Sequence, residues 1–345
     1  MNCTQDYYVF PNLNETPSTG VLILRSFESV YTPVHPFLLI FTSLFSLVSN
    51  ELILIVLSRR EMRKSGINVT MMCIAIMDFG FSAFAIIKTV FDREGKKGSW
   101  IHALLQILYT QWSIAFHAAS LLLAVAMAFC RVMALRKAGK NKFWNSPRCS
   151  LRISVAIFIF SFLFTVFVPF SMRITQVDKN VYEVGAEPLF IANNCFWVKT
   201  VQAAYAVMLK GFPCVSMSIL SLILICKVSD GKKSRASTKH NNSSTESVKQ
   251  MNRSSRLIIG VLIVFLITEI PQMCGSLFAS LFYVDYSRYI FPALGDFTYL
   301  LALLNSSVAF VIYSTLSSTF RKTFSRIFFP RSLHTNLFKV IIHSN

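Results

Sequence analysis

The chain of 345 residues is 54% hydrophobic and only 14% charged, and its mean hydropathy is +0.53. Soluble globular domains carry about 25% charged residues, so this composition favours a membrane protein. The formal net charge of +18 can indicate a nucleic-acid partner, but the basic residues lie between apolar runs and form no soluble basic module. The eight cysteines show no CxxC pair and no Cys/His cluster, which argues against a zinc site.

Seven apolar stretches are each long enough to cross about 30 Å of hydrocarbon, which takes roughly 20 helical residues. They cover residues 35–57, 67–90, 101–135, 151–172, 201–226, 257–283 and 290–317. The runs are continuously apolar rather than alternating, which favours helices over a β-barrel. The sequence therefore predicts an all-α membrane protein with a seven-helix transmembrane bundle.

This interpretation divides the chain into three parts. Residues 1–34 form an extracellular N-terminal segment, residues 35–317 form the transmembrane domain, and residues 318–345 form a short amphipathic eighth helix and a cytoplasmic tail. The first 30 residues lack a basic start followed by an apolar core, so we expect no cleavable signal peptide.

Lysine and arginine gather on one side of the predicted bundle. Four, seven, eight and five of them lie, respectively, in residues 58–66, 131–152, 227–256 and 321–345. The positive-inside rule makes this side cytoplasmic, which predicts a multi-pass protein of the plasma membrane with an extracellular N-terminus. The glycosylation sequons at Asn2 and Asn14 agree with this orientation, because glycosylation occurs on the external side.

Polar side chains and prolines interrupt the apolar runs. The most informative are Asn50, Asp78, Ser120, Arg131, Pro213, Glu269, Pro271 and Tyr313. A charge inside the bilayer is expensive and marks a candidate functional site, and a proline inside a helix removes a backbone hydrogen bond. The segment "FLITEIPQMCG" places Glu269 and Pro271 two residues apart, so it is a strong candidate for a conformational switch.

The order and spacing of these residues resemble the rhodopsin-like (class A) G-protein-coupled receptors. Asn50, the motif "AIMD" ending at Asp78, and Arg131 stand where that family has its signatures in helices one, two and three. The segment "NSSVAFVIY" stands where the family has Asn-Ser-x-x-Asn-Pro-x-x-Tyr. The segment "STFRKTF" resembles the family's amphipathic eighth helix, with Phe320 and Phe324 expected to face the bilayer.

A more specific resemblance is to the nematode serpentine chemoreceptors of the Srw class, which are similar to FMRFamide and myosuppressin peptide receptors. The segments "SRREMRKSGINVTMMCIAIMD", "FLITEIPQ" and "NSSVAFVIY" carry it, together with Arg131, which lacks the usual acidic neighbour. The resemblance implies a receptor rather than an enzyme. Such a receptor senses an extracellular neuropeptide or chemosensory small molecule and activates a heterotrimeric G protein.

The resemblance also assigns activation roles. Glu269 stands where most class A receptors have a tryptophan, and Pro271 is the expected bend of the sixth helix. Arg131 is expected to face the G protein, and Tyr313 to help hold the active arrangement. Three states remain open for Glu269: paired with sodium beside Asp78, protonated because burial disfavours a charged carboxylate, or hydrogen-bonded and inert.

Sodium is the one cofactor that the resemblance implies. The positions that match the family's sodium ligands are Asp78, Ser120, Asn305 and Ser306. The family's next ligand, an asparagine, is replaced by Ala309, so the set is one ligand short. Glu269 is a candidate to supply the missing charge, and the alternative is that Asp78 and Glu269 share one proton.

The ligand is expected to enter from the extracellular side. By helical projection, the side chains that line a cavity above Glu269 are Ser113, His117, Tyr205, Gln272 and Tyr299. Each can instead simply pack against its neighbours. The acidic residues of the external rim are Glu183, Glu187, Asp285 and Asp296. They either attract a basic ligand or remain solvated loop charges.

The external cysteines depart from the family's pattern. The family joins the top of its third helix to the second external loop, but residues 100–117 contain no cysteine. Cys195, in "IANNCFWV", is therefore either free or paired with Cys3, the other external cysteine. A bridge to Cys3 would pin the N-terminus over the ligand cavity.

Two other functions fit part of the sequence. Cys130, Ala309 and the missing family disulfide fit a degenerate receptor that folds but does not signal. A seven-helix ligand-gated ion channel of the insect odorant-receptor type places its N-terminus inside, against the observed charge bias. An intramembrane enzyme is disfavoured, because a single Asp and a single Glu form no recognised catalytic spacing.

Overall fold

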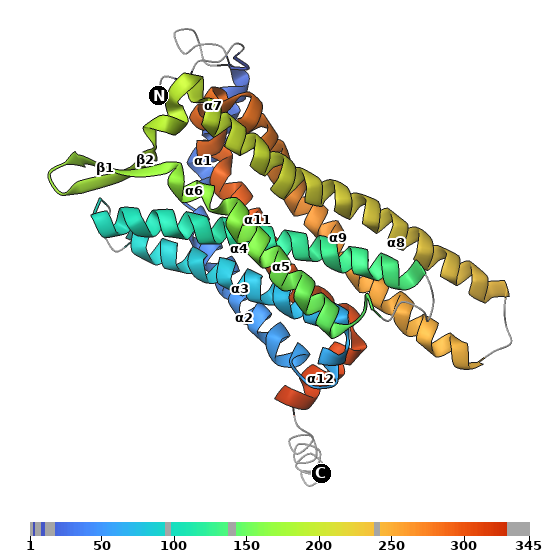
Figure 1. Cartoon of the computed structure of the whole chain (residues 1–345). Coiled ribbons are helices and arrows are strands. Elements are labelled where there is room, and N and C mark those ends of the chain that lie inside the picture. Colours follow the sequence, from blue (N-terminus) through green and yellow to red (C-terminus); the bar gives the residue numbers. More distant parts are fainter. Residues whose placement is uncertain are drawn as a thin grey trace.

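Figure 1 shows the computed structural model of the chain, which describes Cys3, residues 8–10 and residues 18–93, 98–136, 143–237 and 242–329. Within these residues, seven helical spans are long and apolar enough to cross a membrane. They are His35–Leu57, Gly66–Phe91, Trp100–Ala134, Pro147–Phe170, Pro188–Cys226, Ile263–Leu281 and Tyr283–Thr315. The predicted seven-helix bundle is confirmed, and the largest difference is the fifth span, which begins well before residue 201.

The bundle is built from helices that follow one another closely along the chain. The elements of the first half are α1 (Thr19–Tyr31), α2 (His35–Leu57), the 3₁₀ turn η1 (Met62–Lys64), α3 (Gly66–Arg93), α4 (Trp100–Arg136), α5 (Pro147–Thr165) and α6 (Phe167–Phe170). Those of the second half are β1 (Met172–Asp178), β2 (Val181–Ala186), α7 (Pro188–Tyr205), the π turn η2 (Ala206–Gly211), α8 (Phe212–Ser237), α9 (Asn242–Leu281), α10 (Tyr283–Asp285), the π turn η3 (Tyr286–Ile290), α11 (Phe291–Leu316) and α12 (Ser318–Phe328). Prolines stand at the start of α2, α5, α7 and α11, where a missing N–H costs no helix hydrogen bond.

The helices pack side by side along most of their length (Figure 1). Helix α2 packs against α3 and α11, α4 packs against α3, α5 and α8, and α9 packs against α8 and α11. The β1–β2 hairpin lies at one end of the bundle and α12 at the other. We call these the hairpin end and the α12 end.

The bundle interior has two apolar clusters separated by a polar layer. The larger cluster lies toward the α12 end and includes Ile53, Met71, Met127, Leu224 and Phe265. The smaller cluster lies toward the hairpin end and comprises Leu39, Phe81, Ala85, Ala302 and Leu303. Between them along the helices lie the buried polar residues Ser46, Asn50, Asp78, Ser82, Glu269 and Ser306. The polar side chains therefore lie at mid-depth, where no bulk water reaches them.

The outer surface of the bundle is apolar, as expected of helices that face lipid. On α5, the strongly exposed side chains are Leu151, Val155, Ile159, Phe160 and Leu163. In a soluble protein such a surface would drive aggregation, but in a bilayer it faces acyl chains of equal apolarity. The bilayer is therefore the environment that this surface requires.

A two-stranded antiparallel hairpin adds to the predicted all-helical fold. Strand β1 pairs with β2 from Met172 opposite Ala186, and Asn180 occupies the turn with a φ of 63°. Asparagine tolerates this left-handed conformation because its short polar side chain bonds locally. The hairpin is held to the loop before α4, since the N–H of Tyr182 donates to the carbonyl of Gly98 at 2.6 Å. Gly98 has a φ of 89°, a conformation that favours glycine.

The predicted N-terminal segment contains helix α1, which packs on α11. The hydroxyl of Tyr31 lies 3.0 Å from Nδ1 of His35, and the Tyr31 ring packs edge-on against the ring of Phe297. Burial, and then the nearby carboxylate of Asp296, raises the pKa of Tyr31 to about 12, so its hydroxyl stays protonated and can donate to His35. The helix thus closes the hairpin end between α2 and α11.

The amphipathic helix α12 follows the last span, as predicted. Ser317 caps it, because its hydroxyl accepts from the N–H of Phe320 at 3.2 Å. The expectation that Phe320 faces the bilayer is wrong: its side chain is buried and meets the rings of Phe310 and Tyr313. Phe320 thereby joins the larger apolar cluster at the α12 end of the bundle, and the ring of Phe324 stacks on the ring of Phe320.

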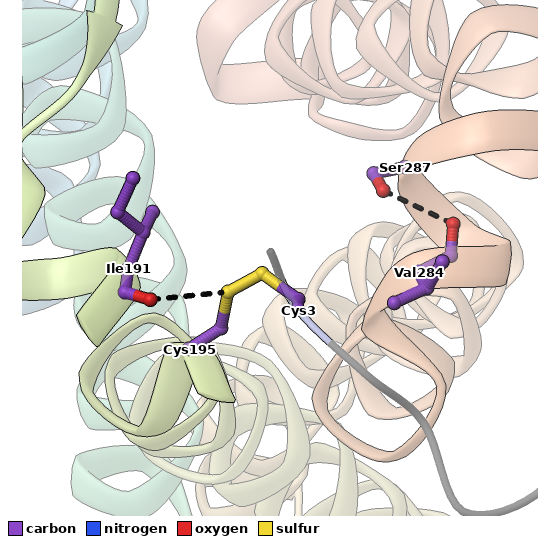
Figure 2. Close-up of a disulfide and its surroundings, with 5 residues drawn as sticks. All are labelled: Cys3, Ile191, Cys195, Val284 and Ser287. Atoms are coloured by element: carbon purple, nitrogen blue, oxygen red, sulfur yellow. Dashed lines mark hydrogen bonds between the residues drawn. A yellow bond between two sulfur atoms is a disulfide. The ribbon is translucent and has the colours of Figure 1, made fainter. Parts of the chain in front are cut away.

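Helix α7 contains a break that turns Cys195 into the protein. Asn193, Asn194 and Cys195 have φ values of 50°, 58° and 60°, and the Cys195 side chain is fully buried. Figure 2 shows its disulfide with Cys3, across a Cα–Cα distance of 5.5 Å and a sequence separation of 192 residues. Of the two alternatives left open by the sequence, the structure therefore has the bridge.

The disulfide fixes one end of a segment that makes further contacts with the bundle. The N–H of Val9 donates to Oδ2 of the buried Asp285 at 2.7 Å, and Phe10 meets Tyr289 edge-on. Asp285 is thus a structural acceptor rather than an open rim charge. The predicted glycosylation sites Asn2 and Asn14 lie outside the described residues.

We expect the variants Cys3→Ser and Cys195→Ser each to lower the unfolding temperature of the purified receptor. Closing so long a loop removes much conformational entropy from the unfolded chain, typically about 2–4 kcal/mol for a disulfide. The double variant should lose no more than either single variant, because all three lack the same bond. Additive losses in a thermal-unfolding series would show instead that the two cysteines act separately.

Candidate functional site

A buried ion pair joins the fifth and sixth spans. Lys210, in η2, places Nζ 2.8 Å from Oε2 of Glu269, in α9. The Glu269 side chain is fully inaccessible and that of Lys210 is 15% exposed. The pair answers the question of how a carboxylate survives in the apolar sixth span, because a buried charge requires an opposite charge or hydrogen bonds.

Two further side chains complete the site around the lysine. Nζ of Lys210 lies 2.8 Å from Oε1 of Gln272 and 2.9 Å from Nε2 of His117. An ammonium group only donates, so its three N–H groups are directed to Glu269, Gln272 and His117. Nε2 of His117 also lies 3.5 Å from Oε1 of Glu269, so the imidazole contacts both members of the ion pair. We call Lys210, Glu269, His117 and Gln272 the mid-bundle cluster.

The position of Lys210 follows from the backbone around it. Pro213 has no N–H to donate to the carbonyl of Leu209, so a regular α-helix cannot continue through this point. The chain instead widens into the π turn η2, in which the N–H of Phe212 bonds back to Val207. Single π turns shift the side chains that follow one face of a helix, and they occur often at functional sites.

The position of Glu269 follows from α9. Glu269 and Gln272 are three residues apart and therefore lie on the same face of the helix, where the Gln272 amide also donates to Oε1 of Glu269 at 3.4 Å. Pro271 lies between them and leaves the carbonyl of Ile267 without its helix donor. Asn305 of α11 donates to the same Oε1 at 3.4 Å, so the carboxylate also contacts the seventh span.

The predicted ligand-binding residues fall into two groups. His117 and Gln272 belong to the mid-bundle cluster, and Ser113 and Tyr299 lie next to one another on its hairpin-end side. Phe81 joins these two pairs, since its ring stacks on His117 at 5.1 Å and meets Tyr299 edge-on at 5.5 Å. Four of the five residues therefore share one site.

Tyr205 is the predicted ligand residue that lies apart. Its ring packs edge-on against Phe164 of α5 at 5.8 Å, and its buried hydroxyl has no hydrogen-bond partner among the described residues. The π turn that begins at Ala206 changes the helical phase at this point, so a projection based on a regular helix fails here. A residue that the projection missed, Tyr109, donates to the Tyr299 hydroxyl at 2.6 Å.

Each of the four predicted sodium ligands has a hydrogen-bond partner inside the bundle. Asp78 is buried within hydrogen-bonding reach of Ser120. The Ser306 hydroxyl instead lies 2.8 Å from that of Ser46 and donates to the carbonyl of Leu303. Asn305 is directed toward Glu269.

Among the described residues, no group of three or more His, Cys, Asp or Glu side chains could hold a metal ion. A sodium site built from Ser and Asn oxygens is not of that kind, so sodium binding stays a prediction, and we derive no step through a sodium ion.

Ser46 and Asn50 of α2 organise the polar layer beside Asp78. The Ser82 hydroxyl donates to that of Ser46 at 2.7 Å, and the Asn50 amide donates to the carbonyl of Ser306 at 3.0 Å. These bonds join α2, α3 and α11. The polar layer therefore holds α2, α3 and α11 together beside the mid-bundle cluster.

The α12 end carries the other predicted switch residues. Arg131 is 6% exposed at the end of α4 and lies close to the buried Tyr313 of α11. Its neighbour Cys130 is also buried. The guanidinium of Arg131 is thus held inside the bundle, where it is available to a partner only if the helices around it separate.

Lys210 is the functional residue that the sequence reasoning missed. A signal was present, because Lys210 is the one charged residue in the apolar run 201–226. A lone lysine inside a membrane span requires a partner as much as a lone glutamate does. The sequence thus indicates that Lys210 needs an acidic partner, with Asp78 and Glu269 among the candidates.

Seven membrane-spanning helices, buried charges at mid-depth and an amphipathic helix after the last span define a receptor of the G-protein-coupled type. The chain belongs to the family described as serpentine type 7TM GPCR chemoreceptor Srw, whose model matches residues 37–331. It is also 23% identical over 369 aligned residues to the G-protein coupled receptor dmsr-1 of Caenorhabditis elegans, covering 89% of this chain and 70% of that protein. The family is one of receptors, and signalling through a G protein is its general role.

We expect Lys210→Met to destabilise the receptor by about 3–5 kcal/mol, because it leaves the Glu269 carboxylate buried without its counter-charge. Adding Glu269→Gln should recover much of that loss, since no charge then remains unpaired. Thermal unfolding of the single and double variants measures this coupling. Lys179→Met, which removes an exposed lysine in the hairpin turn, serves as the control and should unfold like the wild type. If Lys210→Met and Glu269→Gln each lowered stability by the same amount and the two losses added in the double variant, the pairing would be contradicted.

Proposed function

We propose that this receptor lies in the plasma membrane with its hairpin end outside and that it binds a neuropeptide or a small molecule above the mid-bundle cluster. The observation that carries the proposal is the position of Lys210. It lies at mid-depth and bonds to both α4 and α9, and the ring of Phe81 links its partner His117 to Tyr299. The excess of Lys and Arg at the α12 end supports this orientation.

The chemistry of the cluster defines what the ligand must offer. Lys210 holds three acceptors, so a ligand carbonyl or carboxylate can replace one of them without leaving the ammonium unsatisfied. The aromatic rings of Phe81, Tyr109 and Tyr299 suit an aromatic or apolar group beside that acceptor. A peptide with an aromatic residue near its C-terminus and an aromatic carbonyl compound both meet this description.

Ligand binding would then act on α9. Competition for Lys210 weakens its bond to Glu269, and α9 can pivot at Pro271, where the helix already lacks one backbone hydrogen bond. Movement of the α12 end of α9 exposes the buried Arg131 and Tyr313 to a heterotrimeric G protein. A ligand shifts this equilibrium only by its differential affinity for the two states.

The decisive experiment screens amidated peptides and small volatile molecules against cells that express the receptor, with G-protein activation as the readout. Arg131→Gln should abolish the response to any active ligand at unchanged surface expression. Arg152→Gln removes an exposed basic residue at the same end of the bundle and should respond like the wild type. Silence to both ligand sets, with identical basal activity in Arg131→Gln and wild type, would favour the degenerate receptor.

Orientation is tested separately with an epitope tag before Met1. Antibody should label the tag on intact cells, because the basic loops retain the α12 end in the cytoplasm. Asn2→Gln together with Asn14→Gln should abolish the mobility shift that a glycosidase produces. A tag accessible only after permeabilisation would contradict the proposed orientation and favour the ion-channel alternative.

A further inference from the structure

A cleft at the α12 end combines basic residues with an apolar wall. It has a volume of about 630 Å³ and lies between α3 and the start of α5, beside the turn η1. Its basic residues are Arg60, Arg63, Lys64 and Arg148. The cleft is remote from the mid-bundle cluster and has no part in the proposed signalling mechanism.

The four basic residues of the cleft are exposed. Within the described part of the chain, no carboxylate lies in ion-pair distance of these four side chains. The nearest acidic residue in sequence, Glu61, pairs instead with Arg326 of α12 at 3.7 Å. Four like charges gathered without a counter-charge repel one another, so an anion bound among them relieves that repulsion.

The apolar wall continues from these charges into the membrane-spanning region. Val69, Met72, Cys73 and Ile76 of α3 are spaced by three and four residues, so they form one stripe on that helix. The stripe is about 10 Å long at 1.5 Å per residue. Leu151 of α5, which is 52% exposed, lines the opposite side. A cleft with this shape accepts an acyl chain below a charged head group.

A close backbone contact fixes the two sides of the cleft. The N–H of Gly66 donates to the carbonyl of Asn145 at 2.9 Å. A Cβ at position 66 would come within 2.8 Å of the Asn145 backbone and 2.6 Å of the Ser150 hydroxyl. Only glycine permits this approach, which places Arg148 opposite Arg63 and Lys64 across the mouth of the cleft. The two sides of the cleft are therefore held together by a direct backbone contact.

We propose that this cleft binds an anionic phospholipid with a phosphorylated head group, such as a phosphoinositide of the cytoplasmic leaflet. The phosphates contact the four basic residues, and one acyl chain lies along the α3 stripe. Basic pockets between membrane helices on the cytoplasmic side are suited to such head groups. The cytoplasmic location rests on the orientation proposed above, whereas the binding chemistry does not.

The test is native mass spectrometry of the purified full-length receptor in detergent, with added dioleoyl phosphatidylinositol 4,5-bisphosphate. Binding should exceed that of dioleoyl phosphatidylcholine. Lys64→Gln combined with Arg148→Gln should weaken phosphoinositide binding roughly twenty-five-fold, because each basic residue near an anionic surface contributes about fivefold in affinity. Arg321→Gln combined with Lys322→Gln removes the same charge from α12 at the same end of the bundle and should bind like the wild type. Thermal unfolding of both double variants controls for folding.

Two further measurements identify the occupant. Leu151→Trp fills the apolar side of the cleft and should weaken binding of the lipid, while soluble inositol 1,4,5-trisphosphate should bind much more weakly than the lipid. Equal binding of the soluble phosphate and the lipid would overturn the assignment to a lipid. Equal losses in the α12 control would also overturn the proposal, and so would full lipid binding by Lys64→Gln with Arg148→Gln. The assay needs no agonist, so its failure is distinct from failure of the proposed signalling function.

Discussion

The ion pair between Lys210 and Glu269 is the constraint around which the rest of the bundle is arranged. At mid-depth in a bilayer no water solvates these two opposite charges, so each is stabilised by the other. The pair fixes η2 against α9, and through His117 it also fixes α4. A chain that carried either charge alone would have to neutralise it or fold differently.

In the proposed mechanism this ion pair acts as the switch. It lies at the depth of the polar layer, with one apolar cluster on each side. Pro271 and the π turn η2 weaken the two helices that carry the pair at the same depth. A change in the partners of Lys210 therefore acts where both helices bend most readily. The buried Arg131 lies at the far end of that movement.

The sequence was sufficient for the fold, because seven long apolar runs and an uneven distribution of basic residues constrain a membrane bundle strongly. It also located Glu269 and Pro271, whose presence in an apolar run is unusual. It did not locate Lys210, since the partner of a buried charge depends on which helices pack together. Helical projection failed at Tyr205 because η2 changes the helical phase, and it failed at Phe320 because a short amphipathic helix can bury its apolar face in the bundle.

We infer that the Lys210–Glu269 bond holds α9 in its resting position. Spin labels on Ile263→Cys of α9 and Val155→Cys of α5, two exposed positions, report the distance between these helices by double electron–electron resonance in lipid nanodiscs, once exposed native cysteines are replaced. Glu269→Gln should shift the distance distribution to longer values in the absence of any ligand. An unchanged distribution in a folded Glu269→Gln receptor would contradict it.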